Sequence, residues 1–198
     1  MAPGRIEAEA RRAAALALAE GPAGAARAAI AVAEAAVAEA RRDPGLSAKL
    51  DALACRAGCA WCCYQMVGVT PAEASLVAEG LAALAPAVRA DIATHAATAA
   101  RRGEGLDQRG WTLRRLACPL LDGDGRCLVH AHRPLPCRGY NSADADICRR
   151  ALDGEAVRIP VLAAPWTAFA EAQAGLAGAL ADAGCDPGPV TLVAALRR

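Results

Sequence analysis

Four cysteines fall within the nine residues 55–63, CRAGCAWCC, and this density of thiols limits what the chain can fold into. Four more follow at longer intervals, and a ninth, Cys185, stands alone near the C-terminus. The second group consists of Cys118, Cys127, Cys137 and Cys148. Predicted helices separate the two groups of four cysteines. If these helices fold back on one another as a hairpin, the two groups meet, so we expect one shared centre.

The rest of the sequence favours metal binding by these thiols over disulfide bonds between them. The N-terminus, MAPGRIEAEARR, has no apolar run after its charges, so we expect no secretory signal. The longest uncharged apolar stretch, residues 159–170, contains two prolines and is too short to cross a bilayer. We therefore expect a soluble cytoplasmic protein with no membrane partner. In that compartment clustered cysteines more often bind metal or carry out redox chemistry than form disulfides, which remain an alternative for an exported chain.

Composition predicts a thin helical core. The chain is 55% hydrophobic, but much of this is alanine, and only Trp 3, Tyr 2 and Phe 1 are aromatic. Alanine buries little area, so helices must approach one another closely. The net charge of +1 gives no strong attraction to nucleic acid, which we do not expect as a partner.

Residues 5–42 predict a helical arm of two segments, broken at Gly21-Pro22. Its buried stripe is expected to be mostly alanine, with Leu16, Ile30 and Val37. We expect the arm to pack on the body of the protein, although it would also suit pairing with another copy or binding a protein partner.

Helix signals continue through the middle of the chain. Asp43 or Ser47 caps a short helix expected to end at Gly58, and residues 67–69 read as briefly extended. Thr70 and Glu73 then form a capping box around a proline at the first helical position. A following helix is predicted from Pro86 to Arg102.

The pattern changes after residue 111. Two apolar runs flank Asp122-Gly-Asp-Gly125, which predicts a β-hairpin. Ser142 is expected to cap a helix that reaches Gly154. An amphipathic helix over 165–183 and a last short helix follow, with expected core residues Trp166, Phe169, Ala172, Leu176, Leu180, Leu192, Val193 and Leu196.

These signals predict a mainly α fold, a compact helical domain with one small β-hairpin and a cysteine cluster at its centre. We expect three parts: an alanine-rich helical arm over 1–42, a cysteine-cluster metal-binding domain over 43–155, and a C-terminal helical extension over 156–198.

The cysteine spacing suits a metal because a loop can bend all its sulfurs inward. Zinc takes four ligands, and iron–sulfur clusters also take cysteine thiolates, so zinc, iron and an iron–sulfur centre all stay open. Arg56 and Arg138 are expected to lower neighbouring thiol pKa values. Adjacent residues tend to point apart, so Cys62 and Cys63 serve different ions or one is a free thiol. The predicted metal ligands are Cys55, Cys59, Cys62, Cys63, Cys118, Cys127, Cys137 and Cys148.

Other interpretations of single residues are weaker. A thioredoxin-type pair at Cys59 and Cys62 lacks its strand–helix context, and the Cys55-x₃-Cys59-x₂-Cys62 spacing of radical SAM enzymes lacks their barrel. Cys185 is expected to be a small buried hydrophobe. His130 and His132 are expected on a solvated hairpin edge rather than as ligands.

The segments CRAGCAWCC, VTPAEA and CPLLDGDGRCLVHAHRPLPCRGYNS together resemble the YkgJ-like cysteine-cluster family, the CxxCxxCC zinc- or iron-chelating domain, over about residues 55–150. The resemblance implies that all eight cysteines belong to the family pattern, and that Arg133, Pro134 and Arg138 match its RP and CR elements. The chain departs from the family at His130, where an aromatic residue is common, and at Ala131, which replaces an acid.

Three functions follow from these observations. The first is a protein that chelates zinc or iron, as an ion or an iron–sulfur centre. The second is a metal- or cluster-dependent protein-modifying enzyme, because a similar domain occurs in a flagellin lysine methylase; catalytic and cofactor-binding residues are unknown. The third is a metal-stapled interaction module that docks a protein partner through its N-terminal arm.

Overall fold

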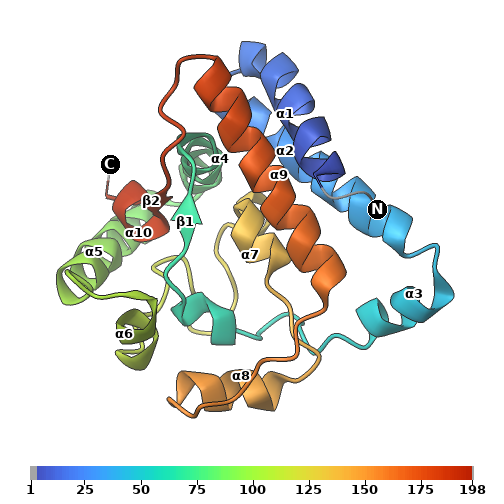
Figure 1. Ribbon diagram of the computed structural model, residues 1–198. Helices are drawn as coiled ribbons and strands as arrows, with labels where there is room; N and C mark the ends of the chain where they lie inside the picture. The colour runs from blue at the N-terminus through green and yellow to red at the C-terminus, as the bar shows by residue number, and fades with distance from the viewer. Residues whose placement is uncertain (1–3, 198) are drawn as a thin grey trace.

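The computed structural model describes residues 4–197 and confirms the mainly α fold (Figure 1). Short strands and 3-10 turns connect the helices. The elements in chain order are α1 (Arg5–Ala17), η1 (Leu18–Glu20), α2 (Pro22–Ala40), α3 (Pro44–Asp51), η2 (Trp61–Tyr64), β1 (Gly68–Val69), α4 (Pro71–Ala82), α5 (Pro86–Arg102), α6 (Gln108–Leu113), η3 (His130–His132), α7 (Leu135–Gly139), α8 (Ala145–Leu152), α9 (Ala163–Asp182), β2 (Val190–Thr191) and α10 (Leu192–Ala195).

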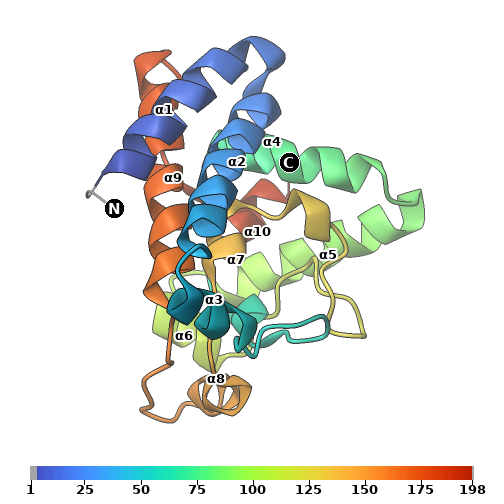
Figure 2. The same cartoon turned by 90° about the vertical axis from the view of Figure 1, so that its right-hand side faces the viewer.

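The two helices of the N-terminal arm and α9 near the C-terminus pack together as a bundle, seen on one side of the molecule in Figure 2. The core of this bundle is mostly alanine, joined by Ile6, Leu176 and Leu180. The helices approach closely because Gly175 has no side chain: a Cβ there would lie 2.3 Å from the carbonyl oxygen of Glu7. Leu16, expected in the buried stripe, is instead 82% exposed.

The arm therefore packs on the rest of the chain. The same core includes Leu76 of α4, Leu135 of α7 and Phe169 of α9. The three-part division at residues 42 and 155 stays a prediction, since these parts share one core. Trp166, expected in that core, is 44% exposed, and its ring centroid lies 5.5 Å from that of Tyr140.

The capping box at the start of α4 is confirmed, and its glutamate also accepts hydrogen bonds from other helices. Glu73 is 0% exposed, and one of its carboxylate oxygens accepts hydrogen bonds from the Thr70 backbone amide at 2.7 Å and from Gln173 of α9 at 2.9 Å. Its other oxygen accepts from the amide of Leu135 at 2.8 Å. Burial raises the pKa of Glu73, and these hydrogen bonds oppose the rise. One carboxylate thus joins α4, α7 and α9.

The two-stranded sheet pairs segments that are distant in sequence. β1 is antiparallel to β2, with Gly68 opposite Thr191. The hairpin expected around residues 122–125 is limited to one bridge, between Leu121 and Cys127. Its turn is held by Asp122, whose side chain accepts hydrogen bonds from the amides of residues 124 and 126, so the turn chemistry was predicted correctly but the strands do not extend from it.

Some helix boundaries differ from expectation. α3 is capped by Asp43 and ends at Asp51, well before Gly58. α8 is capped by Asp144 rather than Ser142, whose hydroxyl accepts a hydrogen bond from the Asp144 amide.

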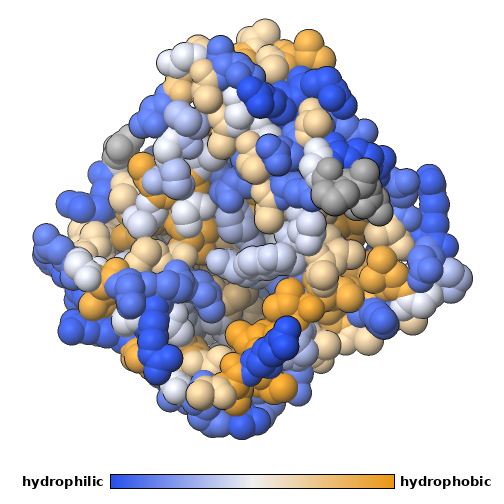
Figure 3. All heavy atoms as spheres, viewed as in Figure 1, coloured by the Kyte–Doolittle hydropathy of each residue, from blue (hydrophilic) through white to orange (hydrophobic). Residues whose placement is uncertain are grey.

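No helix in the described residues is long and apolar enough to span a membrane. On the face drawn in Figure 3, hydrophobic atoms gather in the lower half, below the start of α9 and towards α8.

Candidate metal centre

A cavity of about 640 Å³ lies among the segments that carry the cysteines. Its walls are formed by the loop after α3, by η2, by the turn around residues 118–127 and by the start of α7. Seven of the eight predicted ligands line it, namely Cys55, Cys59, Cys62, Cys63, Cys118, Cys127 and Cys137. The two cysteine segments, about 60 residues apart in sequence, therefore face one space.

Backbone hydrogen bonds bring these segments together. The amide of Cys118 donates to the carbonyl of Cys63 at 2.8 Å, which joins η2 to the second segment. The amide of Ala54 donates to the carbonyl of Ser142 at 2.9 Å, and the thiol of Cys55 lies 3.9 Å from the same oxygen. The loop that carries the first cysteines is thus fixed by residues that precede α8.

The turn before Cys127 packs against the loop that carries the first cysteines. Gly125 has φ 75°, and a Cβ at this position would lie 2.9 Å from the carbonyl oxygen of Gly58. Both the left-handed backbone and the close approach require glycine here.

Replacing Gly125 by alanine is expected to lower the free energy of unfolding by about 1–2 kcal/mol, the cost of placing a Cβ in the left-handed region. Gly123→Ala is the matched control, because a Cβ there would meet no atom within 4 Å. Urea unfolding of both variants checks the prediction, and equal stabilities would contradict it.

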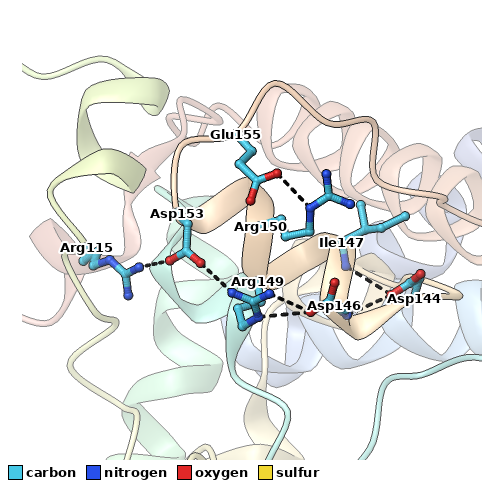
Figure 4. A network of polar contacts seen from close by, with 8 residues as sticks. All are labelled: Arg115, Asp144, Asp146, Ile147, Arg149, Arg150, Asp153 and Glu155. Carbon is cyan, nitrogen blue, oxygen red and sulfur yellow. Dashed lines mark hydrogen bonds and ion pairs between the residues drawn. The ribbon is translucent and has the colours of Figure 1, made fainter.

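Cys148 lies outside the cavity wall, on α8, which packs mainly on η2. Ion pairs hold this helix in place (Figure 4). Arg149 pairs with Asp146 and with Asp153, each at 2.8 Å, and Asp153 also pairs with Arg115 from the segment after α6. Of these three pairs, Arg115–Asp153 joins the end of α8 to another segment, whereas the two pairs of Arg149 lie within the helix and its C-cap.

Burial keeps the metal-free thiols protonated. It raises the pKa of Cys118 to about 12 and raises the pKa of Cys137 well above its ordinary value. The pKa of Cys62 is also raised, first by its hydrogen bond with Cys63 and then by burial. A metal ion must therefore displace protons when it binds here.

Arg133 is one of the arginines near these thiols. It lines the cavity, and its charge partly offsets the rise in the pKa of Cys62, Cys127 and Cys137. Within residues 4–197 it makes no ion pair, and its buried Nε has no hydrogen-bond partner. The sequence missed this role, because only the fold brings position 133 to Cys62.

Arg138 also lines the cavity, but its guanidinium has partners outside the thiol group. Its guanidinium pairs with Glu34 of α2 at 2.8 Å and donates to the carbonyl of Arg133 at 2.8 Å. A carboxylate and loop carbonyls therefore hold this side chain in place.

The two histidines do not lie on a strand, because η3 replaces the expected hairpin edge. His130 is exposed at the rim of the cavity, and Arg133, followed by burial, lowers its pKa. His132 packs instead against Gly80 of α4.

All nine cysteines are free thiols. Cys185, predicted to be buried, is exposed after the end of α9. Within the described residues, no three Cys, His, Asp or Glu side chains are already gathered as ligands of one ion. Each cysteine sulfur can move between staggered rotamers about one bond, so its position in the cavity is adjustable.

The donor set fits a thiophilic metal. Seven thiols and no Asp or Glu line the cavity among the residues described. Sulfur donors select zinc and iron–sulfur centres, whereas magnesium and calcium require oxygen.

Comparison with known families agrees with this chemistry. The family model described as "CxxCxxCC: Putative zinc- or iron-chelating domain" matches residues 54–155, just over half of the 198-residue chain. Searches of curated proteins and of solved structures gave no match. All eight candidate cysteines lie within the matched residues. The chain therefore belongs to the CxxCxxCC family.

Proposed function

We propose that this protein chelates zinc or iron, the latter as an ion or an iron–sulfur centre, through its eight clustered cysteines. The single observation that carries the proposal is the cavity lined by seven of these thiols and by no carboxylate among the residues described. The family match supports metal chelation in general. The proposed ligands are Cys55, Cys59, Cys62, Cys63, Cys118, Cys127, Cys137 and Cys148.

The bound metal would supply a centre that ties η2, the turn before Cys127, α7 and α8 together. Residues of this chain contribute the rest of the environment. The charge of Arg133 favours the thiolate form of its neighbours, and Leu120 and Val129 exclude water from one side of the cavity.

Purification without oxygen, followed by elemental analysis and a visible spectrum, tests this function. We expect zinc in a colourless protein or iron in a brown one, since cysteine-ligated iron–sulfur clusters absorb visible light. Replacing Cys118 and Cys137 together by serine should lower the metal content, whereas Cys185→Ser should leave it unchanged because that thiol is remote and exposed. A folded wild-type protein that takes up neither metal would contradict the proposal.

A further inference from the structure

The eight thiols do not form one undivided group. Three of them, the inner trio, lie on the core side of the cavity: Cys118, Cys127 and Cys137. All three pack against the same buried cluster of apolar side chains, which includes Leu120 and Val129. After burial, repulsion from Cys118, Cys62 and Cys127 contributes to the raised pKa of Cys137.

A second set of three, the outer trio, gathers around Ser142: Cys55, Cys59 and Cys148. The thiol of Cys55 lies 3.9 Å from the Ser142 carbonyl oxygen. A hydrogen bond with the Ser142 side chain partly offsets the rise in the pKa of Cys148. Burial raises the pKa of both thiols, and repulsion from Cys59 adds to this rise in each case. None of the outer trio packs against the apolar cluster that holds the inner trio.

The adjacent pair Cys62 and Cys63 lies between the two trios. Cys62 interacts electrostatically with Cys55 and Cys148 on the outer side and with Cys118 and Cys137 on the inner side. Cys63 is hydrogen-bonded to Cys62, and its carbonyl accepts from the amide of Cys118. Each trio lacks one thiol of the four that zinc takes, and the pair provides two.

We propose that the chain holds two separate four-thiolate centres, one at each trio, each completed by one thiol of the 62–63 pair, and that the outer centre exchanges its metal faster. This inference rests on the proposed function, since it divides the same ligands. It selects one of the arrangements that eight cysteines allow.

The difference in exchange follows from how each trio is held. Cys55 is exposed and lies in a loop without regular structure. Cys148 is on α8, at the edge of the molecule in both Figure 1 and Figure 2, and the ion pairs that orient this helix are largely exposed, so each adds little stability. The inner trio is backed by buried apolar residues, and α7 is joined to α4 and α9 by Glu73.

Counting zinc and timing its release test the division. The metal-free protein is loaded with Zn²⁺ without oxygen, desalted, and mixed with a coloured chelator. We expect about two zinc ions per chain, released in a fast phase and a slow phase of equal size. Cys148→Ser should keep one ion and lose the fast phase, and Cys137→Ser should keep one ion and lose the slow phase. Cys185→Ser should keep both phases.

Asp153→Asn adds a variant that replaces no candidate ligand. It removes the ion pair that joins the end of α8 to Arg115 and the pair with Arg149 within the helix, so it should speed the fast phase by up to about fivefold and leave the slow phase unchanged. If Cys137→Ser fails to fold by circular dichroism, the wild-type count and the Asp153→Asn kinetics still decide.

The outcomes separate this inference from the proposed function. One zinc ion per folded wild-type chain, or a complete loss of zinc in folded Cys148→Ser, would overturn the two centres and leave metal chelation intact. An equal acceleration of both phases in Asp153→Asn would overturn the difference in exchange. A folded wild-type chain that binds no zinc or iron would overturn the proposed function itself.

Discussion

Replacing Glu73 by alanine is expected to lower the free energy of unfolding by about 3 kcal/mol or more, because each buried donor left without a partner costs about 1–3 kcal/mol. The carboxylate accepts from the amides of Thr70 and Leu135 and from the side chain of Gln173. Since it is 0% exposed, water cannot replace it without opening the contact between α4, α7 and α9. The loss should therefore spread beyond the first turn of α4.

The control for this substitution is Glu79→Ala on the same helix. Glu79 is exposed and pairs with Arg27 on the surface, so its loss should change stability by about 0.5 kcal/mol or less. Chemical unfolding followed by circular dichroism measures both variants. Similar stabilities of Glu73→Ala and Glu79→Ala would show that the buried carboxylate does not hold the three helices together.

The second large effect is expected at Gly175, where alanine should lower the free energy of unfolding by about 2 kcal/mol, a typical cost of overpacking. A Cβ at this position would lie 2.3 Å from the carbonyl oxygen of Glu7 and 2.8 Å from the amide nitrogen of Arg11. Both atoms belong to the backbone of α1, so they cannot move aside as a side chain can. The bundle would have to separate, and its alanine core would lose contact along the whole interface.

Gly178→Ala, one turn further along α9, is the matched control. A Cβ there would meet only the flexible side chain of Arg11, at 3.2 Å, while alanine favours the helix by up to about 1 kcal/mol. Thermal and urea unfolding should show a lower stability for Gly175→Ala and an unchanged or higher stability for Gly178→Ala. Equal melting temperatures would mean that α1 and α9 do not pack as closely in solution.

Features that depend on neighbouring residues were predictable from the sequence. Pro22 after Gly21 marks the break between α1 and α2, and Thr70 with Glu73 marks the start of α4, because caps and proline act through the chain next to them. Pro86 and Gly103 bound α5 for the same reason.

Features that depend on distant contacts were not predictable. α7 is only five residues long, and its amide at Leu135 donates to Glu73, which lies 62 positions away in sequence. The expected burial of single residues was also wrong in places, because Leu16 and Cys185 are exposed. The sheet forms between β1 and β2, which no local pattern connects.

In the candidate site, too, the local features were predictable from the sequence and the distant contacts were not. The spacing within 55–63 identified a dense thiol segment, and the number of cysteines identified the second one. Spacing could not assign Cys148 to the side of Cys55, because Ser142 joins them only in the folded chain. Nor could it distinguish Arg133 from Arg138, which are five residues apart and differ only in what they face.

The pairing of α1 with α9 has a consequence for biosynthesis. The ribosome makes the first helices early, but the surface that covers them is not available until residues 163–182 have been translated. All eight clustered thiols emerge before that moment, while the nascent polypeptide still lacks its closing helix. The bundle that α9 completes can therefore form only after every clustered cysteine has left the ribosome.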